Sequence, residues 1–490
     1  MTSIAGVMTL HRRLGLLVGP AVLLWFLSGL VLLWVPYPSL TEREWLMTAQ
    51  SIQPHNCCAA LSRLLARLDR PEGIESVRIR MVGGRPVATA QFLNGTMAAL
   101  TVDTAEPIVP LTRDWAHRVA SQAAPGMLVE QMDLIDHDVW TVHQRFDPYR
   151  PLWKVQLSGD RRSVLYVSSV TGDVVQDTTA DDRRWNLVGA VIHWWYLPWL
   201  RRHWAWWDHV VWWVSAIGTV TVVAGGLILG RAWAKHGWSG LFIGRWRVHR
   251  VLGVIAGIST CCWMASGWLS MDHGRWFSDG KVNVEDRERF MGGRLIPRDV
   301  ESLADFSATL VDETVKEIRL IKMNGIVHLV AHTSPSHQAI WVMTGPDESP
   351  REAFQDEVVK AAARLLLGDG VLTITKANGN DVGICSATGD ETASSLIRVE
   401  TTDPDARGVQ VDGRTGAVVE RVDFSRRLYH RLFDGLHRWD VPWFSQHCDL
   451  RRMLMSLWCL LGTGLAGSGI WIGLFRPGVE DSQPYTGVRR

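Results

Sequence analysis

Histidine is the residue type that most suggests chemistry in this chain of 490 residues, because six of its 17 histidines form three pairs that follow two repeat offsets. Imidazole is a common metal ligand in proteins. Ligands that recur in register would occupy equivalent positions in two similar units. The pairs are His11 with His249, His193 with His437, and His203 with His447.

The histidine pairs belong to a longer internal repeat. The stretch 11–29 recurs at 249–267 with an offset of 238 residues, matching at His, Arg, Leu, Gly, Trp and Ser-Gly positions. The stretch 171–225 recurs at 415–469 with an offset of 244, including a Thr-Gly-x-Val-Val run and a Pro-Trp pair. Register held over so many residue types indicates a duplication. Two halves of the same topology imply a pseudo-twofold axis that relates them.

Four apolar runs must position these histidines. They lie at about 14–35, 210–230, 251–271 and 453–475, and none has a charge inside. Each reaches the roughly 20 residues that a bilayer core requires. We therefore predict four transmembrane helices, at 11–35, 208–230, 249–271 and 451–475. The first run is longer than the apolar core of a signal peptide and has an internal copy, so we expect it to be a retained helix.

Basic residues at the ends of the runs predict the orientation. Arg12 and Arg13 precede the first run, and the loop at 231–248 carries four Lys or Arg residues and no acidic one. By the positive-inside rule these segments, together with the tail at 476–490, face the cytoplasm. Both termini are then inside, and two long segments lie outside, in a bacterial periplasm.

The overall composition excludes a disordered chain and argues against a nucleic-acid-binding protein. Hydrophobic residues make up 47%, and 51 basic against 50 acidic residues leave a net charge of +1. A disordered chain would be less hydrophobic, and a nucleic-acid-binding protein is usually clearly basic. The 26 tryptophans, nine of them between Trp185 and Trp213, point instead to membrane–water interfaces. We predict interfacial segments at 187–207 and 433–450.

The two external segments, 36–186 and 272–432, are expected to fold as α+β domains. Helical spacing predicts helices at 57–68 and 351–367, and alternation predicts strands at 74–81, 86–92, 97–102, 371–376 and 396–401. A Thr-Gly turn near the end of each segment is typical of a hairpin. The predicted fold class is an integral membrane α-helical protein, with four transmembrane helices in a duplicated two-helix unit and two extracytoplasmic α+β domains.

The histidine-led helix entries, the Thr-Gly-x-Val-Val hairpins and the histidine-bearing segments after them resemble the PepSY-associated transmembrane proteins, also called iron-regulated membrane proteins. The resemblance covers nearly the whole chain. It implies PepSY-like domains on a bacterial inner-membrane protein. Members of this family include ferric-siderophore reductases that hold two b-type haems through helix histidines. The chain departs from the usual pattern in its Trp-rich segment, and in Ser28-Gly29 and Ser266-Gly267, where members usually have Thr-Gly.

On this resemblance, two haem b groups are the expected cofactors. A b-type haem needs two axial ligands at one depth on different helices, and imidazole is a common choice. The predicted iron ligands are His11 and His249 near the inner face, and His193 and His437 near the outer face. Further candidates for haem binding are His203, His447, and two arginines that could pair with haem propionates, Arg12 and Arg250.

Simpler roles remain open for each of these residues. A histidine at a membrane surface can extend its ring to water or cap a helix. Arg12 and Arg250 can anchor the cytoplasmic ends of their helices. Sequence equivalence fixes the depth of a histidine, and it leaves open which histidines share an iron.

The resemblance implies a function in which electrons cross the membrane to an extracytoplasmic ferric complex such as an iron–siderophore, in support of iron uptake. The glycine-rich run at 462–467 lies inside an apolar span rather than after a strand, so it is no nicotinamide-binding motif. The electron donor would then be a separate cytoplasmic carrier. The alternatives are a haem-free PepSY membrane protein that regulates or scaffolds a periplasmic partner, and a transporter. Almost no charge lies within the spans, which argues against a transporter.

Overall fold

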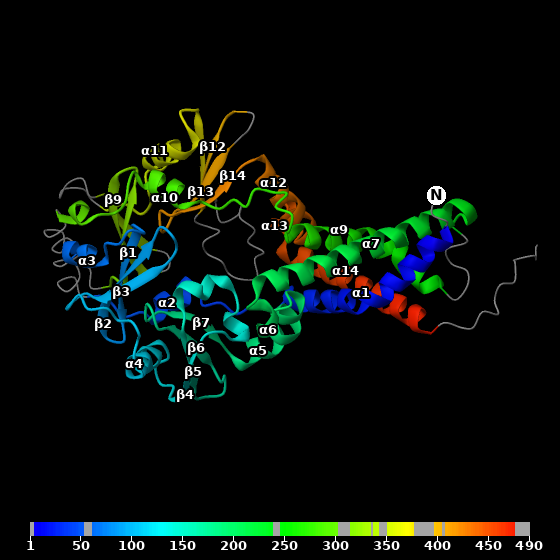
Figure 1. Cartoon of the computed structure of the whole chain (residues 1–490), viewed down its shortest axis with the longest axis horizontal. Coiled ribbons are helices and arrows are strands. Elements are labelled where there is room, and N and C mark those ends of the chain that lie inside the picture. The colour runs from blue at the N-terminus through cyan, green and yellow to red at the C-terminus, as the bar shows by residue number, and fades with distance from the viewer. Residues whose placement is uncertain are drawn as a thin grey trace, which may run out of the picture.

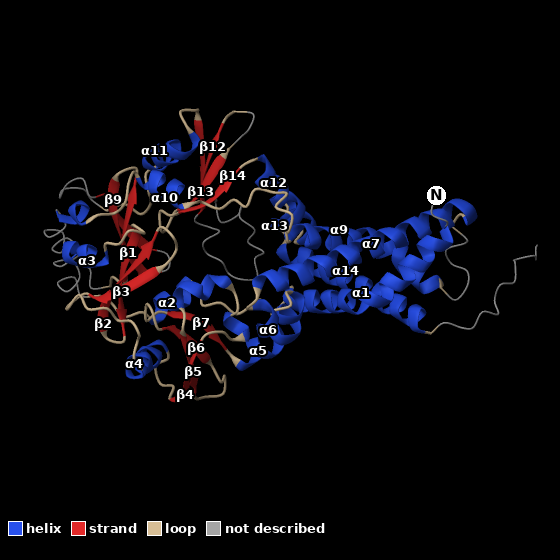
Figure 2. Cartoon of the chain, viewed as in Figure 1, coloured by secondary structure: helices blue, strands red, loops and turns tan. Residues whose placement is uncertain are grey.

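The computed structural model describes residues 4–52, 61–238, 246–301, 314–334, 337–342, 350–376, 396–403 and 407–475. This part of the chain divides into a bundle of four long helices and a region that contains all the described strands, here called the sheet region (Figures 1 and 2). The bundle projects from one side of the sheet region, and the N-terminus lies near the far end of the bundle (Figure 1).

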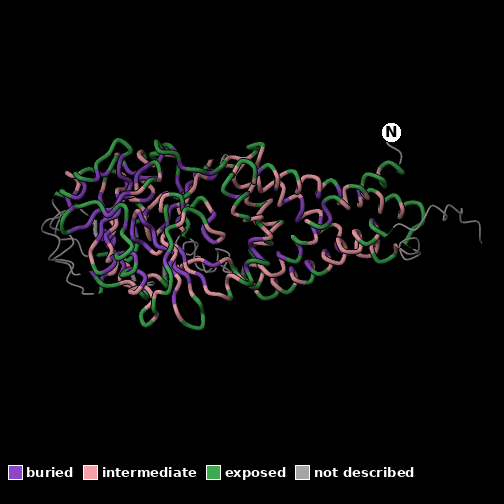
Figure 3. The backbone as a smooth tube through the Cα atoms, turned by 60° about the horizontal axis from the view of Figure 1, so that its bottom comes forward, coloured by how far each residue is buried: buried purple, intermediate pink, exposed green. Residues whose placement is uncertain are grey.

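Four helices form the bundle, and each is long and apolar enough to cross a membrane. They are α1 (Ile4–Leu32), α7 (Trp204–His236), α9 (Arg247–Ser270) and α14 (Cys448–Leu474). The buried backbone concentrates in the sheet region, whereas most of the bundle is partly or fully exposed, as apolar helices that face lipid would be (Figure 3). The prediction of four membrane-length helices is therefore confirmed.

The observed helix ends differ from the predicted ends by a few residues. Helix α1 begins at Ile4, before His11, and α7 continues to His236, past the predicted end at 230. A helix continues beyond its apolar run because each added residue gains a backbone hydrogen bond at little further cost. His11 and His249 therefore lie inside helices rather than at their first residues.

Each bundle helix packs against two neighbours, in the cyclic order α1, α7, α9 and α14. A side chain at Gly462 of α14 would collide with the ring of Phe26 on α1. Small residues that admit a neighbouring side chain in this way are the usual means of helix association in lipid. The core of the bundle contains Val18, Val22, Phe26, Trp263, Met264, Met455 and Cys459.

The sheet region contains three antiparallel sheets, with strand orders β10-β9-β8-β1-β2-β3, β4-β5-β6-β7 and β11-β12-β13-β14. The strands of the first half are β1 (Ile74–Val82), β2 (Arg85–Phe92), β3 (Met97–Thr101), β4 (Val129–Ile135), β5 (Leu152–Leu157), β6 (Val164–Ser168) and β7 (Val174–Thr178). Those of the second half are β8 (Glu317–Met323), β9 (Ile326–Ser334), β10 (His337–Val342), β11 (Leu372–Lys376), β12 (Leu396–Thr401), β13 (Gly408–Asp412) and β14 (Val418–Val422).

Shorter helices cover these sheets and connect them to the bundle. Helix α4 (Arg113–Ala123) packs on the sheet of β4 to β7, and α11 (Asp356–Leu367) packs on β11, β12 and β13. The others are α2 (Glu42–Thr48), α3 (Leu61–Leu68), α5 (Ala180–Asn186), α6 (Pro198–Arg201), α10 (Val284–Met291), α12 (Phe424–His430) and α13 (Pro442–Ser445). Two π-helical turns, Leu187–Val191 and Arg431–His437, lead from the sheet region toward the bundle.

The two long segments predicted as domains contribute strands to one shared sheet. Strand β1 of the first segment pairs antiparallel with β8 of the second, and Arg78 lies opposite Arg319. Each segment alone would expose one edge of a three-stranded meander, and an unpaired edge is a ready template for another strand. The pairing of β1 with β8 gives the backbone groups of both edges hydrogen-bond partners and makes one six-stranded sheet.

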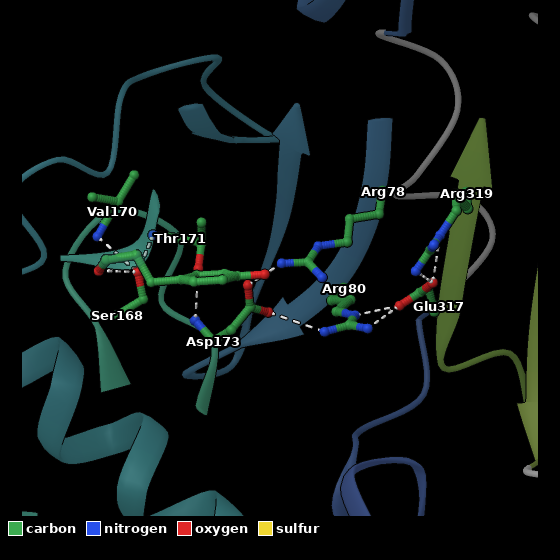
Figure 4. Close-up of polar contacts among 9 residues, drawn as sticks. Arg78, Arg80, Ser168, Val170, Thr171, Asp173, Glu317 and Arg319 are labelled. Carbon is green, nitrogen blue, oxygen red and sulfur yellow. Dashed lines mark hydrogen bonds and ion pairs between the residues drawn. The ribbon is translucent and has the colours of Figure 1, made fainter. Parts of the chain in front are cut away.

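A buried ionic network joins the two halves at this seam (Figure 4). Arg80 of β1 pairs with Glu317 of β8 and also contacts Asp173, which precedes β7, at 3.2 Å. Arg78 pairs with Asp173, and Arg319 lies 2.7 Å from Glu317. The side chains of Glu317 and Asp173 are only 1% and 6% exposed. Removing one carboxylate would therefore leave buried positive charge uncompensated.

Most of the predicted elements of the sheet region are present. The five predicted strands match β1, β2, β3, β11 and β12 to within one residue at each end. The helix predicted at 351–367 begins only at Asp356, because Arg351 exchanges two backbone hydrogen bonds with Ile340. Of the helix predicted at 57–68, only 61–68 lies within the described residues, and it is helical.

Candidate functional site

The end of the bundle far from the sheet region contains the first histidine pair, here called the distal pair. His11 of α1 and His249 of α9 have ring centroids 6.3 Å apart, with an interplanar angle of 45°. These are equivalent positions of the sequence repeat. The structure thus brings together two histidines for which the sequence predicted equal depth and left contact open.

The end of the bundle next to the sheet region contains the second pair, here called the proximal pair. His193 and His437 also have ring centroids 6.3 Å apart, with an interplanar angle of 63°. His193 follows the first π-helical turn, and His437 is the last residue of the second. Turns of this type occur frequently at functional sites because they redirect side chains that a regular helix would place elsewhere.

The separation of the rings suits a metal ion bound between them. A metal–nitrogen bond of about 2.0–2.1 Å, with the centroid about 1.1–1.2 Å beyond the nitrogen, puts two opposed imidazoles about 6.3 Å apart. Both pairs have this separation. Two aromatic rings that merely pack together can have the same centroid separation. The hydrogen bonds of the ring nitrogens therefore help to decide whether these histidines could bind a metal.

Hydrogen bonds define which nitrogen of each ring holds the proton. Nδ1 of His11 lies 2.8 Å from the carbonyl oxygen of Thr221, which can only accept, so this Nδ1 donates. The other three Nδ1 atoms lie 3.0–3.2 Å from serine hydroxyls that donate their own protons to backbone carbonyls. A neutral ring then keeps its lone pair on Nε2, as metal-ligating histidines usually do. The serines are Ser28 for His193, Ser266 for His437 and Ser468 for His249.

A glycine faces each of the four rings. A Cβ atom at Gly225 would lie 2.8 Å from Cε1 of His11, and one at Gly29 would lie 3.3 Å from Cε1 of His193. Gly469 and Gly267 occupy the corresponding places beside the other two rings, at 3.1 and 3.4 Å. These are equivalent positions of the repeat, and a side chain there would press on the ring.

Tryptophans fix the backbone of the proximal histidines. Nε1 of Trp25 donates to the carbonyl oxygen of His193 at 3.0 Å, and Nε1 of Trp263 donates to that of His437 at the same distance. The ring of Trp195 lies 5.9 Å from that of Trp25, and the ring of Trp439 lies 5.8 Å from that of Trp263.

Trp195 and Trp439 also share a left-handed backbone conformation, with φ values of 54° and 53°. Such values cost roughly 1–2 kcal/mol for a residue with a Cβ atom. Their sequence offset of 244 marks them as equivalent positions of the repeat. The prediction of the site from its histidines made no use of these two tryptophans. The two residues place the same turn after each proximal histidine.

His203 and His447 occupy different positions from the four paired histidines. They precede α7 and α14 as N-cap residues. Nδ1 of His447 lies 2.9 Å from the carbonyl oxygen of Trp443, and its ring stacks on that indole at 4.7 Å. Within the described part of the chain, no ring contact joins either residue to another histidine. Their role as further candidates for haem binding gains no support from these contacts and stays a prediction.

Arg12 and Arg250 lie beside the distal pair in sequence. Nη2 of Arg12 donates to the carbonyl oxygen of Gly473 at 3.2 Å, near the C-terminal end of α14. A cation there complements the negative end of the helix dipole. Arg250 is half-buried in the first turn of α9. Pairing of these arginines with propionates remains a prediction.

A charged cluster positions the π-helical turn that carries His437. Nδ1 of His430, at the end of α12, lies 2.8 Å from Asp434, and its Nε2 lies 3.3 Å from Glu420 of β14. Hydrogen bonds to Asp434 and then to Glu420 raise the pKa of His430 to about 9, against the lowering effect of burial. Asp434 belongs to the same turn as His437, so this imidazolium fixes the turn to the sheet region.

We expect the stability of the protein to fall as the pH rises through this pKa. A pKa that is raised in the folded state gives stability that is complete below the unfolded value of about 6.5 and disappears as the pH approaches 9. The midpoint of thermal unfolding of the detergent-solubilised protein should decrease between pH 6.5 and 9. The His430→Gln variant should show a smaller decrease. Identical pH profiles for the two proteins would contradict this role of His430.

No protein-family model matches the chain, and no curated protein is significantly similar to it. The two histidine pairs, their hydrogen bonds and the facing glycines are therefore the basis on which a function can be argued.

Proposed function

We propose that this chain is a haem-b protein of a bacterial inner membrane that passes electrons across the bilayer and reduces an extracytoplasmic ferric complex. The observation that carries the proposal is the pair of 6.3 Å contacts between equivalent histidines at the two ends of one helical bundle. A regulatory or scaffolding protein would need no such pairs.

The residues present fit two bis-imidazole haem sites. His11 with His249, and His193 with His437, would hold the iron through Nε2, because Nδ1 of each ring is engaged in a hydrogen bond. Hydrogen bonds at Nδ1 fix the ring orientation and increase the basicity of the ligand. The facing glycines keep each ring free of a neighbouring side chain.

The separation of the two pairs supports electron movement across a membrane. His11 belongs to the distal pair, and Ser28 contacts His193 of the proximal pair. These two residues are 17 positions apart on α1, a distance of about 26 Å at 1.5 Å per residue. The hydrocarbon core of a bilayer is about 30 Å thick. Two pairs with this spacing would lie near opposite faces of the membrane.

The orientation follows from the charged ends and from a cysteine. Arg12 and the basic residues after α7 favour a cytoplasmic distal end. Cys448, at the proximal end of α14, is disulfide-bonded, and disulfides persist in oxidising compartments. We therefore propose that the sheet region is periplasmic and that both termini are cytoplasmic.

A bound haem supplies reversible one-electron chemistry at its iron. The described residues hold its ligands in place: serine hydroxyls and the Thr221 carbonyl orient the four rings, and Trp25 and Trp263 fix the backbone of the proximal pair. The ferric complex, an iron–siderophore or a similar chelate, is the substrate that would accept the electron outside. A separate cytoplasmic carrier would deliver it, since no nicotinamide-binding motif is apparent in the chain.

We further propose that the chain is a duplicated two-helix unit with PepSY-like segments. The same contacts recur at positions related by the repeat: Ser28 with His193 and Ser266 with His437, Gly225 with His11 and Gly469 with His249. Each half also contributes one three-stranded meander and one four-stranded sheet. An approximate twofold axis would relate the members of each histidine pair.

The glycine that faces His11 gives a prediction with a matched control. In Gly225→Val, the new side chain would displace the ring of His11, so we expect loss of about one of two haems per chain. At the neighbouring Gly226, no atom lies within 4 Å of an added Cβ, and Gly226→Val should keep both haems. Haem per protein, measured as the pyridine complex, checks both. Equal haem content in the two variants would contradict the proposed contact.

The catalytic proposal is tested by mixing the reduced protein with ferric complexes under anaerobic conditions. The protein is reduced with dithionite, freed of excess reductant and mixed with a ferric siderophore in a stopped-flow instrument. We expect the visible spectrum to return to the oxidised form as a ferrous-iron chelator develops its colour. A haem-loaded protein that no ferric complex reoxidises would overturn the reductase activity and leave only electron storage.

A further inference from the structure

A third contact between histidines lies at the proximal end of the bundle, outside the two pairs described above. His209, in the second turn of α7, and His273, three residues after α9 ends, have ring centroids 4.4 Å apart and an interplanar angle of 62°. His209 is exposed, and the side chain of His273 is 28% exposed. Neither ring is fully enclosed by the described residues.

A buried carboxylate orients one of these rings. Asp208 is only 5% exposed, and its Oδ2 lies 2.6 Å from Nδ1 of His273. Because this contact engages Nδ1, Nε2 is the ring nitrogen of His273 that could bind a metal. A carboxylate bound to the far nitrogen of a histidine is the usual second partner of a metal ligand.

The rings of His209 and His273 lie closer together than the rings of the distal and proximal pairs. Two imidazoles in adjacent positions of an octahedral ion, at about 90°, have centroids about 4.4–4.5 Å apart for metal–nitrogen bonds of about 2.0–2.1 Å, whereas the tetrahedral angle would place them about 5.2 Å apart. The observed 4.4 Å agrees with adjacent ligands on one ion. The centroid separation of 6.3 Å in the distal and proximal pairs agrees instead with two ligands on opposite sides of an ion.

The surroundings hold the second histidine in place. Oδ1 of Asp272 accepts hydrogen bonds from the backbone nitrogens of Trp276 and Phe277, at 2.7 and 3.3 Å, which closes the loop around His273. The ring of Trp212 lies 5.3 Å from that of His273 and shields one side of it. A preformed loop lowers the ordering cost of ligand binding.

The duplicated scaffold does not account for this cluster. At the offset of 244, Arg452 and Met453 stand where Asp208 and His209 stand. The half-buried Arg452 lies 3.7 Å from the exposed Asp449, three residues earlier on α14. A feature that only one half possesses is not needed to build the bundle, so it requires another reason.

We propose that His209 and His273, oriented by Asp208, bind one divalent transition-metal ion, such as Fe²⁺ or Zn²⁺, at the proximal end of the bundle. Within the described residues, no group of three or more His, Cys, Asp or Glu side chains is placed to hold a metal. Two protein nitrogens leave the remaining coordination positions to water, so the ion exchanges readily. The site involves none of the four haem-pair histidines and stands whether or not the protein binds haem.

The test is a titration of the full-length protein, purified without a polyhistidine tag, with Zn²⁺ alone in a calorimeter and with Fe²⁺ alone under anaerobic conditions. We expect one saturable site in the wild type and none in His209→Ala or His273→Ala. Asp208→Asn should bind about 10–100-fold more weakly, because it removes the orienting carboxylate. The His203→Ala variant, altered at a nearby exposed histidine outside the cluster, should bind as the wild type does.

Because Asp208 is buried, its variant could lose binding through misfolding, and the exposed His209 makes the decisive variant. His209→Ala with wild-type thermal stability and no saturable site supports the proposal. A wild type without a saturable site, or equal affinity in the wild type, His209→Ala and His273→Ala, overturns it. Haem content measured on the same samples keeps this result separate from the haem proposal, since neither substitution should change it.

Discussion

Replacing His193 or His437 with alanine should remove about one of the two haems per chain and leave the other in place. Under this proposal each proximal histidine would be one of the two ligands of the second haem, and loss of one would leave that site incomplete. The distal pair lies about 26 Å away along α1, and the hydrogen bonds to its Nδ1 atoms come from other residues than those to the proximal pair. Effects at such distant sites are usually independent.

The measurement is haem per protein, with the visible spectrum of the reduced form. His11→Ala and His249→Ala should produce the complementary loss, and the double variant His11→Ala/His193→Ala should be colourless. His203→Ala is the control and should retain two haems. A His193→Ala protein with full haem content and an unchanged spectrum would show that the proximal pair is not a haem site.

Replacing Glu317 with alanine should destabilise the sheet region by about 3–5 kcal/mol, the usual cost of breaking a buried ion pair from one side. The substitution leaves the half-buried Arg319 without this carboxylate and leaves Arg80 with Asp173 alone. Burial would raise the pKa of Glu317, but its ion pairs with Arg319 and Arg80 outweigh burial and hold the pKa far below the usual range. Its contribution is therefore complete above the unfolded value of about 4.3 and is lost only as the pH falls well below it.

Thermal or denaturant unfolding of the detergent-solubilised protein at neutral pH checks this prediction. The matched control is Asp103→Ala, which removes the partner of Arg85 from an ion pair that is 39% and 49% exposed. Exposed pairs contribute about 0–1 kcal/mol, so the control should unfold almost as the wild type does. Equal stability of the two variants would mean that the seam between the halves does not depend on Glu317.

The four helices and the predicted strands could be found from the sequence because their signals are local. An uninterrupted apolar run of about 20 residues has few alternatives to a membrane helix. Strands such as β1 and β2 alternate over their own length and meet at a short turn. The pairing of β1 with β8 has no local signal, since it joins segments more than 200 residues apart. For this reason the sequence predicted two domains where the strands form one central sheet.

The candidate site also has features that the sequence predicted and features that only the structure shows. The repeat predicted that His11 matches His249 and that His193 matches His437, but contact depends on how the two halves associate. In the structure the equivalent residues meet each other, which is the arrangement that a twofold axis between the halves produces. The contact of His209 with His273 lies outside the repeat, so neither offset could reveal it.

The most direct test of the haem proposal is the visible spectrum and haem stoichiometry of the wild-type protein, purified in detergent from haem-replete cells. We predict two haem b groups per chain, with the low-spin spectrum of bis-imidazole ligation in both oxidation states. A colourless protein that is folded and monodisperse would contradict the proposal and favour a haem-free regulatory or scaffolding role.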